Sequence, residues 1–401
     1  MSAVDVRPPT SDDDTTPRPP AGPGLGEAFL DLVDRVISTI ERWLVGDQHG
    51  LYGAAFARIL SGGAVLGILI TNFRQRDLLF GPGSVWNKPM QDVALYWPPT
   101  LTQNLGSTAF LVFYLVTIAF ALGWTLGWHT KITGPLMLLG NVAIIERIPV
   151  LGDQGDNILR IGIFLLLLMN VSEVWSLDAR RRERREHVAV VRHASVAANV
   201  RAVLVNAWRS QPVVPRWLAN TVHNLGYTML AFQIVLIYFS AGMFKTQGGL
   251  WQHGTAIYYP LQLQEYKPFP FLTDLLTYSG VVVNIATYLT VFAQLIFPVA
   301  LLLHLMTRRY GLLAPKLFFR GVYLVIVGFH VSIAVFMALP WFALEMIAFD
   351  AIFVSTATYV GLQTWLARRG EGLRELWFDV TDPVVIWWGR RRGVDPGDPS
   401  A

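Results

Sequence analysis

One stretch of the chain places a lysine where it could accept a proton. Residues 238–259, YFSAGMFKTQGGLWQHGTAIYY, begin as an apolar helix that ends near Gly242, and Lys245 follows at the boundary. Apolar surroundings disfavour an ammonium ion, so a partly desolvated Lys245 would be a neutral amine able to act as a base. The alternative is an anchor whose charge extends to the membrane surface.

The same stretch continues with residues that could surround a bound molecule. Gly248 and Gly249 would let the backbone fold closely around such a site. Trp251 would serve either as a wall of the site or as part of an aromatic belt at the membrane surface. The candidates for a substrate cavity are Arg160, Gly242, Trp251, His253 and Gly254.

A second polar group stands where another apolar segment begins. Asp153, Asp156, Asn157 and Arg160 lie together at the start of the stretch 153–178. Asp156 and Arg160 are four residues apart, so one helix face would hold them as an ion pair. Asp156 or Asn157 would equally serve as a helix cap. If both stretches build one site, Lys245, Asp156 and Arg160 share a pocket.

Four ionisable residues fall inside predicted membrane segments, namely Arg58, His330, Glu345 and Asp350. Such groups are costly in a bilayer unless they are paired, and they often mark function. His330 and Asp350 stand at comparable depths on the two arms of a predicted hairpin. They are either a structural pair that joins the arms or part of a proton relay or quinone contact.

The composition predicts a membrane protein. Of the 401 residues, 53% are hydrophobic and only 15% are charged, well below the roughly 25% charged residues of soluble domains. The chain has no cysteine, which excludes disulfides, thiolate nucleophiles and cysteine-ligated metals. The histidines are few and scattered, so no metal site is predicted. Walker A, nucleophile-elbow and dinucleotide-binding motifs do not occur either.

Apolar windows of bilayer-crossing length predict an all-α integral membrane protein, a polytopic bundle of about eight transmembrane helices. We expect the spans near 54–72, 107–127, 132–149, 157–176, 222–243, 281–304, 319–338 and 341–363. Ahead of them, apolar residues recur at helical spacing from Phe29 to Leu44. This pattern predicts an amphipathic interfacial helix, and packing against the bundle fits it nearly as well.

Clusters of arginine predict the orientation. They occupy the loop 178–220 and follow the sixth and eighth spans, which puts them all on one side of an eight-span chain. Cytoplasmic loops carry an excess of Lys and Arg, so this side is predicted to be cytoplasmic, with both termini. The segments 74–106, 146–156 and 245–280 then converge on the extracytoplasmic face. We interpret the positive charge as a topology signal in a cell-membrane protein surrounded by lipid, without a nucleic-acid partner.

The expected organisation has three parts. Residues 1–25, rich in Pro, Asp and Thr, are predicted to be a disordered cytoplasmic tail. Residues 26–366 form one membrane domain, with the basic cytoplasmic loop 178–220 and the extracytoplasmic loop 245–280. Residues 367–401 are predicted to be a basic cytoplasmic tail.

Four stretches resemble a known family. They are RILSGGAVLGILITNFRQRDLLFGPGS, GDNILRIGIFLLLLMNVSEVWSLD, YFSAGMFKTQGGLWQHGTAIYY and HVSIAVFMALPWFALEMIAFDAIF. They are similar to the horizontally transferred transmembrane (HTTM) domain, which also forms the membrane part of vitamin K-dependent γ-glutamyl carboxylase. Over residues 44–363 the chain looks most like the bacterial branch associated with sporulation-delaying toxin maturation proteins.

The resemblance implies a catalytic role for Lys245. In the carboxylase, the active-site lysine follows an Ala-Gly pair at the end of a membrane helix and precedes a Trp and a Gly. Ala241, Gly242, Lys245, Trp251 and Gly254 match that order. Lys245 would then deprotonate a reduced quinone of the vitamin K type, the cofactor that the resemblance implies. Oxygenation of that quinol makes the strong base that removes a glutamate γ-proton before CO2 adds.

The chain departs from the carboxylase in two ways. The functional histidine of the carboxylase has no counterpart here, and Asp156 and Asn157 occupy about that position as further catalytic candidates. The large lumenal domain that helps to hold the protein substrate has no counterpart after the last span. Quinol chemistry at Lys245 is therefore better supported than full peptide carboxylation.

Two other functions fit the sequence. The chain could be a non-enzymatic maturation, export or immunity factor whose partner is a small secreted or membrane peptide. It could also be a proton-coupled transporter of a small solute that uses His330, Glu345 and Asp350. The transporter is the weaker alternative because no internal repeat is visible in the sequence.

Overall fold

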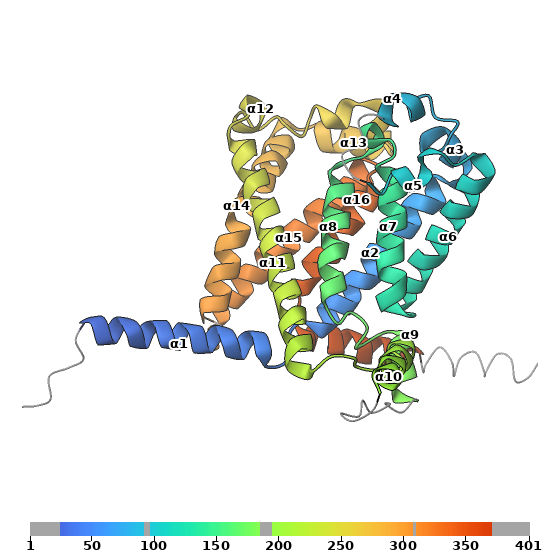
Figure 1. Cartoon of the computed structure of the whole chain (residues 1–401). Coiled ribbons are helices and arrows are strands. Elements are labelled where there is room, and N and C mark those ends of the chain that lie inside the picture. Colours follow the sequence, from blue (N-terminus) through green and yellow to red (C-terminus); the bar gives the residue numbers. More distant parts are fainter. Residues whose placement is uncertain (1–24, 92–96, 185–194, 308–309, 371–401) are drawn as a thin grey trace, which may run out of the picture.

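The computed structural model describes residues 25–91, 97–184, 195–307 and 310–370. Within these ranges all regular structure is helical, and most of it stands as one upright bundle (Figure 1). The predicted all-α class is thereby confirmed. Nearly all of the two predicted tails, 1–25 and 367–401, lies outside the described residues.

Among the described residues, five helices are long and apolar enough to cross a membrane. They are α2 (Leu51–Thr71), α6 (Ser107–Leu126), α11 (Arg216–Thr246), α14 (Gly280–Thr307) and α15 (Leu313–Phe336). A sixth results if the bent pair that follows α15 counts as one span. The chain therefore has the multi-pass character that the sequence predicted.

Two of the eight predicted spans form shorter helices. α7 (Thr130–Ile145) and α8 (Gln154–Leu168) have 16 and 15 residues, so at 1.5 Å per residue each is about 23 Å long, short of a ~30 Å hydrocarbon core. α8 ends eight residues before its predicted end because Asn170 leaves the helical path. The Asn170 backbone N–H donates instead to Nδ1 of His223 on α11, at 2.8 Å.

The predicted span 341–363 is wrong in its second half. α16 (Pro340–Asp350) passes into a 3-10 turn, η6 (Ala351–Phe353), and the next helix, Thr356–Gly370, is bent from it by 113°. Two tyrosine hydroxyls fix the break: Tyr359 donates to the Ala351 carbonyl at 2.6 Å, and Tyr227 donates to the Ile352 carbonyl at 3.2 Å. The Ala351 carbonyl also accepts from the Val354 N–H at 3.2 Å, so side chain and backbone together occupy the carbonyl groups at the break.

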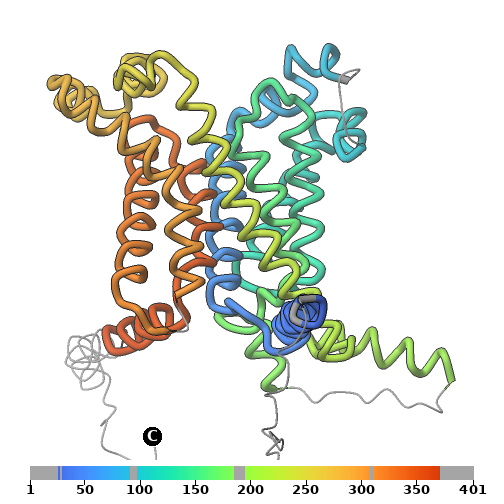
Figure 2. The backbone as a smooth tube through the Cα atoms, turned by 90° about the vertical axis from the view of Figure 1, so that its left-hand side faces the viewer, coloured from blue at the N-terminus to red at the C-terminus, as the bar shows by residue number. Residues whose placement is uncertain are grey.

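The bundle has two sides joined through its middle. α14 and α15 stand on one side and α6 and α7 on the other, with α2, α11 and α16 between them (Figure 2). α16 contacts α2, α8, α11 and α15. Its side chains Ala343, Met346, Ala348 and Phe349 are all buried. This short helix is therefore the central element of the packing.

Glycine permits the close approach of α16 to its neighbours. A β-carbon at Gly162 of α8 would collide with the ring of Phe349, and one at Gly67 of α2 would collide with the ring of Trp341. Helices surrounded by lipid associate through such small residues, because close packing replaces the hydrophobic driving force.

Three helices lie across one end of the bundle. They are α1 (Leu25–Val45), α10 (Val196–Trp208) and Thr356–Gly370, and they run roughly perpendicular to the long helices (Figures 1 and 2). α1 forms where a helix was predicted, and its last turn contacts α11. Phe29, Leu30 and Ile37 on α1 are each more than half exposed.

The opposite end carries the short elements of the three segments predicted to converge there. They are α3 (Arg76–Leu79), α4 (Asn87–Gln91), α5 (Thr100–Gln103), the 3-10 turn η2 (Pro149–Leu151), α12 (Gly249–Gln252) and α13 (Pro270–Thr277). Figure 1 shows α3, α4, α5, α12 and α13 at this end. The predicted convergence of these segments is confirmed.

Replacing Gly162 by alanine tests the close packing of α8 on α16. The added methyl group meets the Phe349 ring, so we expect unfolding free energy to fall by about 1–3 kcal/mol, seen as a lower melting temperature in detergent. Gly328→Ala on α15 is the matched control, since nothing lies within 4 Å of the added carbon. Equal melting temperatures for the two variants would contradict this packing.

Candidate functional site

A chain of buried polar side chains joins α11, α15 and α16. Tyr238, His330 and Asp350, one from each helix, are 1%, 2% and 0% exposed. The Tyr238 hydroxyl donates to Oδ2 of Asp350 at 2.6 Å and lies 3.1 Å from Nε2 of His330. A phenol has one proton to donate, so Nε2 carries the hydrogen of the second bond. Nδ1 of His330 is then an acceptor without a partner among the described residues.

This arrangement revises the predicted pair of His330 and Asp350. The two residues are connected through Tyr238, which the sequence analysis did not single out. Tyr238 stands two helical turns before Lys245, so both project from one face of α11, about 10 Å apart along the axis. A tyrosine buried among apolar helices needs a hydrogen-bond partner. That shared face was the signal in the sequence that would have found it.

Lys245 is half-buried near the end of α11. Nζ lies 3.5 Å from the Ala241 carbonyl oxygen and 5.3 Å from the centre of the Trp251 ring. Within the part of the chain that the structure describes, no carboxylate is at ion-pair distance from this amine. The candidate base stands two helical turns beyond Tyr238, the member of the buried polar chain on the same helix.

The other residues predicted around Lys245 have different surroundings. Gly254 has a φ of +70°, and its carbonyl accepts from Asn284 of α14 at 3.1 Å, which holds the loop after α12 in place. Gly242 packs against Leu295 of α14. His253 is exposed at the end of α12. Of the predicted cavity residues on this loop, Trp251 is the one in contact with the amine.

The start of α8 is a capping box. Asp153 is the N-cap and accepts from the backbone N–H groups of Gly155 at 2.6 Å and Asp156 at 3.2 Å, while Oδ2 of Asp156 accepts from the Asp153 N–H at 3.0 Å. Asp156 was predicted either to pair with Arg160 or to cap the helix, and the structure shows the capping role. Arg160 contacts Asn157 and the Glu146 carboxylate at the end of α7.

A pocket of about 160 Å³ lies between α2, α8 and α16. Asp153, Asp156 and Glu345 contribute carboxylates to it, and Trp341 and Phe342 contribute aromatic rings. Lys245 and Arg160 do not line this pocket, so the prediction that Lys245, Asp156 and Arg160 share one pocket is wrong. α8 and α16 bring Asp156 and Glu345 to one pocket, whereas Lys245 lies beside Trp251 at the end of α11. No group of three or more residues in the described ranges could hold a metal ion.

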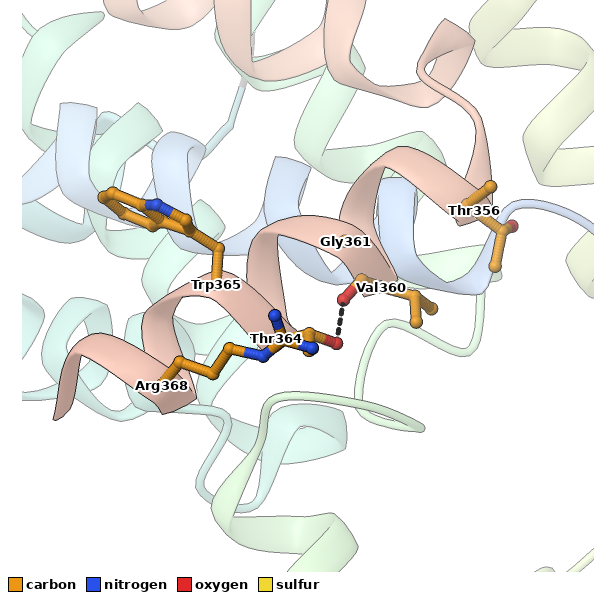
Figure 3. A pocket seen from close by; sticks show the side chains of 7 residues that line it. Thr356, Val360, Gly361, Thr364, Trp365 and Arg368 are labelled. Carbon is orange, nitrogen blue, oxygen red and sulfur yellow. Dashed lines mark hydrogen bonds between the residues drawn. The ribbon is translucent and has the colours of Figure 1, made fainter. Parts of the chain in front are cut away.

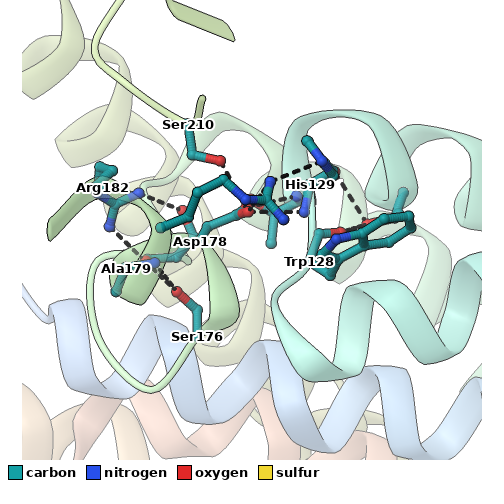
Figure 4. A network of polar contacts seen from close by, with 11 residues as sticks. Trp128, His129, Ser176, Asp178, Ala179, Arg182 and Ser210 are labelled. Atoms are coloured by element: carbon teal, nitrogen blue, oxygen red, sulfur yellow. Dashed lines mark hydrogen bonds and ion pairs between the residues drawn. The ribbon is translucent and has the colours of Figure 1, made fainter. Parts of the chain in front are cut away.

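Arg58 belongs to a separate network at the end with the surface helices. Its guanidinium is fully buried, and Nη2 donates to the Trp175 carbonyl at 2.6 Å. Nearby, Asp178 accepts from the backbone N–H groups of His129 and Thr130, both at 2.9 Å, and from the Ser210 hydroxyl at 2.9 Å (Figure 4). Asp178 thus caps the first turn of α7 from a distant part of the chain.

The surroundings of Asp178 favour its charged form. Burial raises the pKa of its carboxyl, but hydrogen bonds from Thr130, His129 and Ser210 outweigh burial and hold the pKa below its usual value. Arg58 and Asp178 together attach the segment after α8 to α2 and α7. Nε and Nη1 of Arg58 are buried without a partner among the described residues, so this network satisfies its guanidinium only in part.

A hollow of about 690 Å³ is lined by one helix. Thr356, Val360, Thr364, Trp365 and Arg368 all project from Thr356–Gly370 (Figure 3). No second element of the described residues lines this hollow. It is the exposed face of a surface helix rather than a binding cavity.

The chain is 23% identical to the uncharacterized protein YitO of Bacillus subtilis (strain 168) over 363 residues, which cover 85% of this chain and 99% of that protein. No family model and no solved structure matches the chain. The two proteins are thus similar over most of their lengths.

Asp178→Asn tests the network with pH as the variable. Because the pKa is lowered by folding, the stability from Asp178 is complete above its unfolded value of ~3.9 and is lost as the pH falls through the folded value. We expect the variant to lose about 2 kcal/mol at pH 7 and to differ less from the wild type at pH 3 in thermal melts. The exposed Asp34 supplies the control, Asp34→Asn, which should match the wild type at both pH values. A constant difference between wild type and Asp178→Asn across this range would contradict the assignment.

Proposed function

We propose that this chain is a quinol-linked membrane enzyme of the HTTM type, related to vitamin K-dependent carboxylase, and that Lys245 is its base. One observation carries the proposal. Lys245 has no carboxylate partner in the described residues, and it stands on α11 two helical turns beyond Tyr238, which belongs to a buried chain of imidazole, phenol and carboxyl groups. An ion-paired lysine would be held in its charged form, whereas this one is free to accept a proton.

The residues around Lys245 fit a reduced quinone. Trp251 supplies a flat ring beside the amine, and Phe244 and Met243 on the same helical turn are exposed toward the surroundings of the bundle, 74% and 41% respectively. An apolar ring system arriving from the lipid would meet these side chains first. When bound, the quinol supplies an acidic hydroxyl group and the reducing electrons for the reaction with oxygen.

The chain's own groups then handle the proton. The Lys245 amine accepts it and becomes an ammonium ion beside Trp251, whose ring stabilises a cation. His330 is the candidate for the next proton acceptor, because its Nδ1 is an acceptor without a partner in the described residues. Tyr238 and Asp350 complete the path and hold the imidazole in place through the phenol. The ammonium form of Lys245 is therefore stabilised by Trp251, which already lies beside the amine.

We further propose that α7, α8 and α16 complete an eight-pass topology. α6 ends and α11 begins at the same end of the bundle. Between them, α7 crosses to the opposite end and α8 crosses back (Figure 1). Arg180, Arg181, Arg201 and Arg368 gather at the end with the three surface helices. That end is cytoplasmic in this proposal, with both termini, and α1 lies in the membrane interface. Lys245 then faces the extracytoplasmic side of the cell membrane.

The test of the proposed function is quinol epoxidation by the purified chain in lipid nanodiscs. We expect oxygen-dependent turnover by the wild type and a decrease of at least about 100-fold in Lys245→Ala, the usual contribution of a general base. Lys267→Ala is the matched control, because Lys267 lies at the same end but is paired with Asp274 at 2.6 Å. It should retain wild-type turnover.

Full activity of Lys245→Ala would contradict the proposal. The absence of turnover with several quinols would favour the alternative of a maturation, export or immunity factor for a secreted peptide. Co-purification of a small secreted or membrane peptide with the chain would then identify its partner.

The topology is tested by single-cysteine labelling. The chain has no cysteine of its own, so a thiol reagent reacts only with the introduced residue. Gln264→Cys and Ala198→Cys place a thiol at exposed positions on opposite ends of the bundle. In intact cells, a membrane-impermeant maleimide should label Gln264→Cys but not Ala198→Cys. After permeabilisation it should label both variants. Labelling of Ala198→Cys in intact cells would reverse the proposed orientation.

A further inference from the structure

The pocket between α2, α8 and α16 is lined by three carboxyl groups. Asp153 and Asp156 enter it from the first turn of α8, and Glu345 enters from α16. The nearby cations are engaged elsewhere. Arg160 contacts Glu146 and Asn157, and Arg147 contacts Asn87 and the Thr102 carbonyl. No cationic side chain is among the residues that line the pocket.

Glu345 is the member of this group that lacks a partner. It is 2% exposed, it lines the pocket, and no hydrogen-bond donor or cation of the described residues reaches its carboxyl group. The two aspartates are different, because each accepts hydrogen bonds within the capping box. A carboxyl group buried without a partner favours its neutral form, and a cation entering the pocket would stabilise its charged form. The position of Glu345 therefore suits a positively charged ligand from outside the chain.

The shape of the pocket limits what that counter-charge is. The carboxylates do not form a group that could hold a metal ion. Trp341 and Phe342 stand in the wall beside Glu345, and aromatic faces attract organic cations. A volume of about 160 Å³ corresponds to roughly five waters of liquid. It admits the end of a side chain or headgroup but not a whole peptide or lipid.

We propose that this pocket binds a primary ammonium group on a short aliphatic stem, with Glu345 as its principal counter-charge and Trp341 and Phe342 around the stem. Such a group is carried by a lysine side chain or a free amino terminus of a peptide, and by the ethanolamine headgroup of a lipid. Glu345 and the walls distinguish the charged amine from its acylated form, which keeps the stem and loses the charge. The proposal does not depend on the role of Lys245.

The experiment measures binding of a probe peptide, acetyl-Gly-Lys-Gly-amide, to the full chain in phosphatidylcholine nanodiscs by isothermal titration calorimetry. We expect saturable binding to the wild type and at least tenfold weaker binding of the peptide whose lysine is Nε-acetylated. Glu345→Gln should weaken the binding of the lysine peptide at least tenfold. Glu265→Gln, an exposed carboxylate at the same end, is the matched control and should bind like the wild type.

Gly155→Ala tests the shape of the pocket without changing any charge, because a β-carbon at this position would collide with the Glu345 carboxyl group. We expect it to weaken binding at least tenfold. A thermal melt checks the fold of each variant. Glu345→Gln should melt at or above the wild-type temperature, because the amide removes an unpaired buried carboxyl group.

The outcomes separate the sources of the ammonium. Loss of peptide binding when phosphatidylethanolamine is added to the nanodiscs identifies a lipid headgroup as the better ligand, and unchanged binding identifies a peptide amine. Equal affinity for the lysine and acetyl-lysine peptides would overturn the proposal, as would equal affinity of the wild type and Glu345→Gln. Displacement of the peptide by micromolar Ca²⁺ would also overturn it, in favour of a metal.

Discussion

A helix that ends inside an apolar bundle leaves carbonyl groups where no water can satisfy them, and α16 ends in such a place. The structure meets this constraint with side chains from other helices. Tyr359 and Tyr227 donate to the carbonyls at the break, and Tyr238 donates to the Asp350 side chain one residue earlier. These three hydroxyls fix where α16 stops, and the position of α16 decides how α2, α8, α11 and α15 pack.

The same constraint explains the polar residues at the end with the surface helices. Asn224 of α11 donates to the carbonyls of Trp43, Leu44 and Asp47, each at 3.0 Å, and so closes the end of α1. The Asp178 carboxylate accepts hydrogen bonds from the backbone N–H groups at the start of α7. In both cases a side chain distant in sequence satisfies a helix end, which ties the surface elements to the bundle. These polar groups are buried because they hold the fold together.

At the opposite end, Lys245 and Glu345 lack partners of opposite charge. No anion lies at ion-pair distance from Lys245 and no cation from Glu345 in the described residues, and the two do not pair with each other. An ion pair between Lys245 and Glu345 would have held both groups in their charged forms, so that neither could accept a proton or bind a further charged group. α11 and α16 instead present them to different surroundings, one beside a tryptophan ring and the polar chain, the other in a small pocket with aromatic walls. This separation is what makes each a candidate site.

The sequence by itself determined the membrane class, the long helices and the convergence of three loops at one end, because apolar length and charge distribution are properties of local segments. It also located Lys245, Glu345 and Asp350, because an ionisable residue within or beside an apolar segment can be recognised from the sequence alone. It did not determine the partners. That Tyr238 connects His330 to Asp350, that Asp156 meets Glu345 rather than Lys245, and that the last span breaks after Phe353 depend on contacts between helices far apart in the chain. Only the tertiary structure decided these, because a buried polar group takes whichever partner the packing of the helices brings within hydrogen-bond distance.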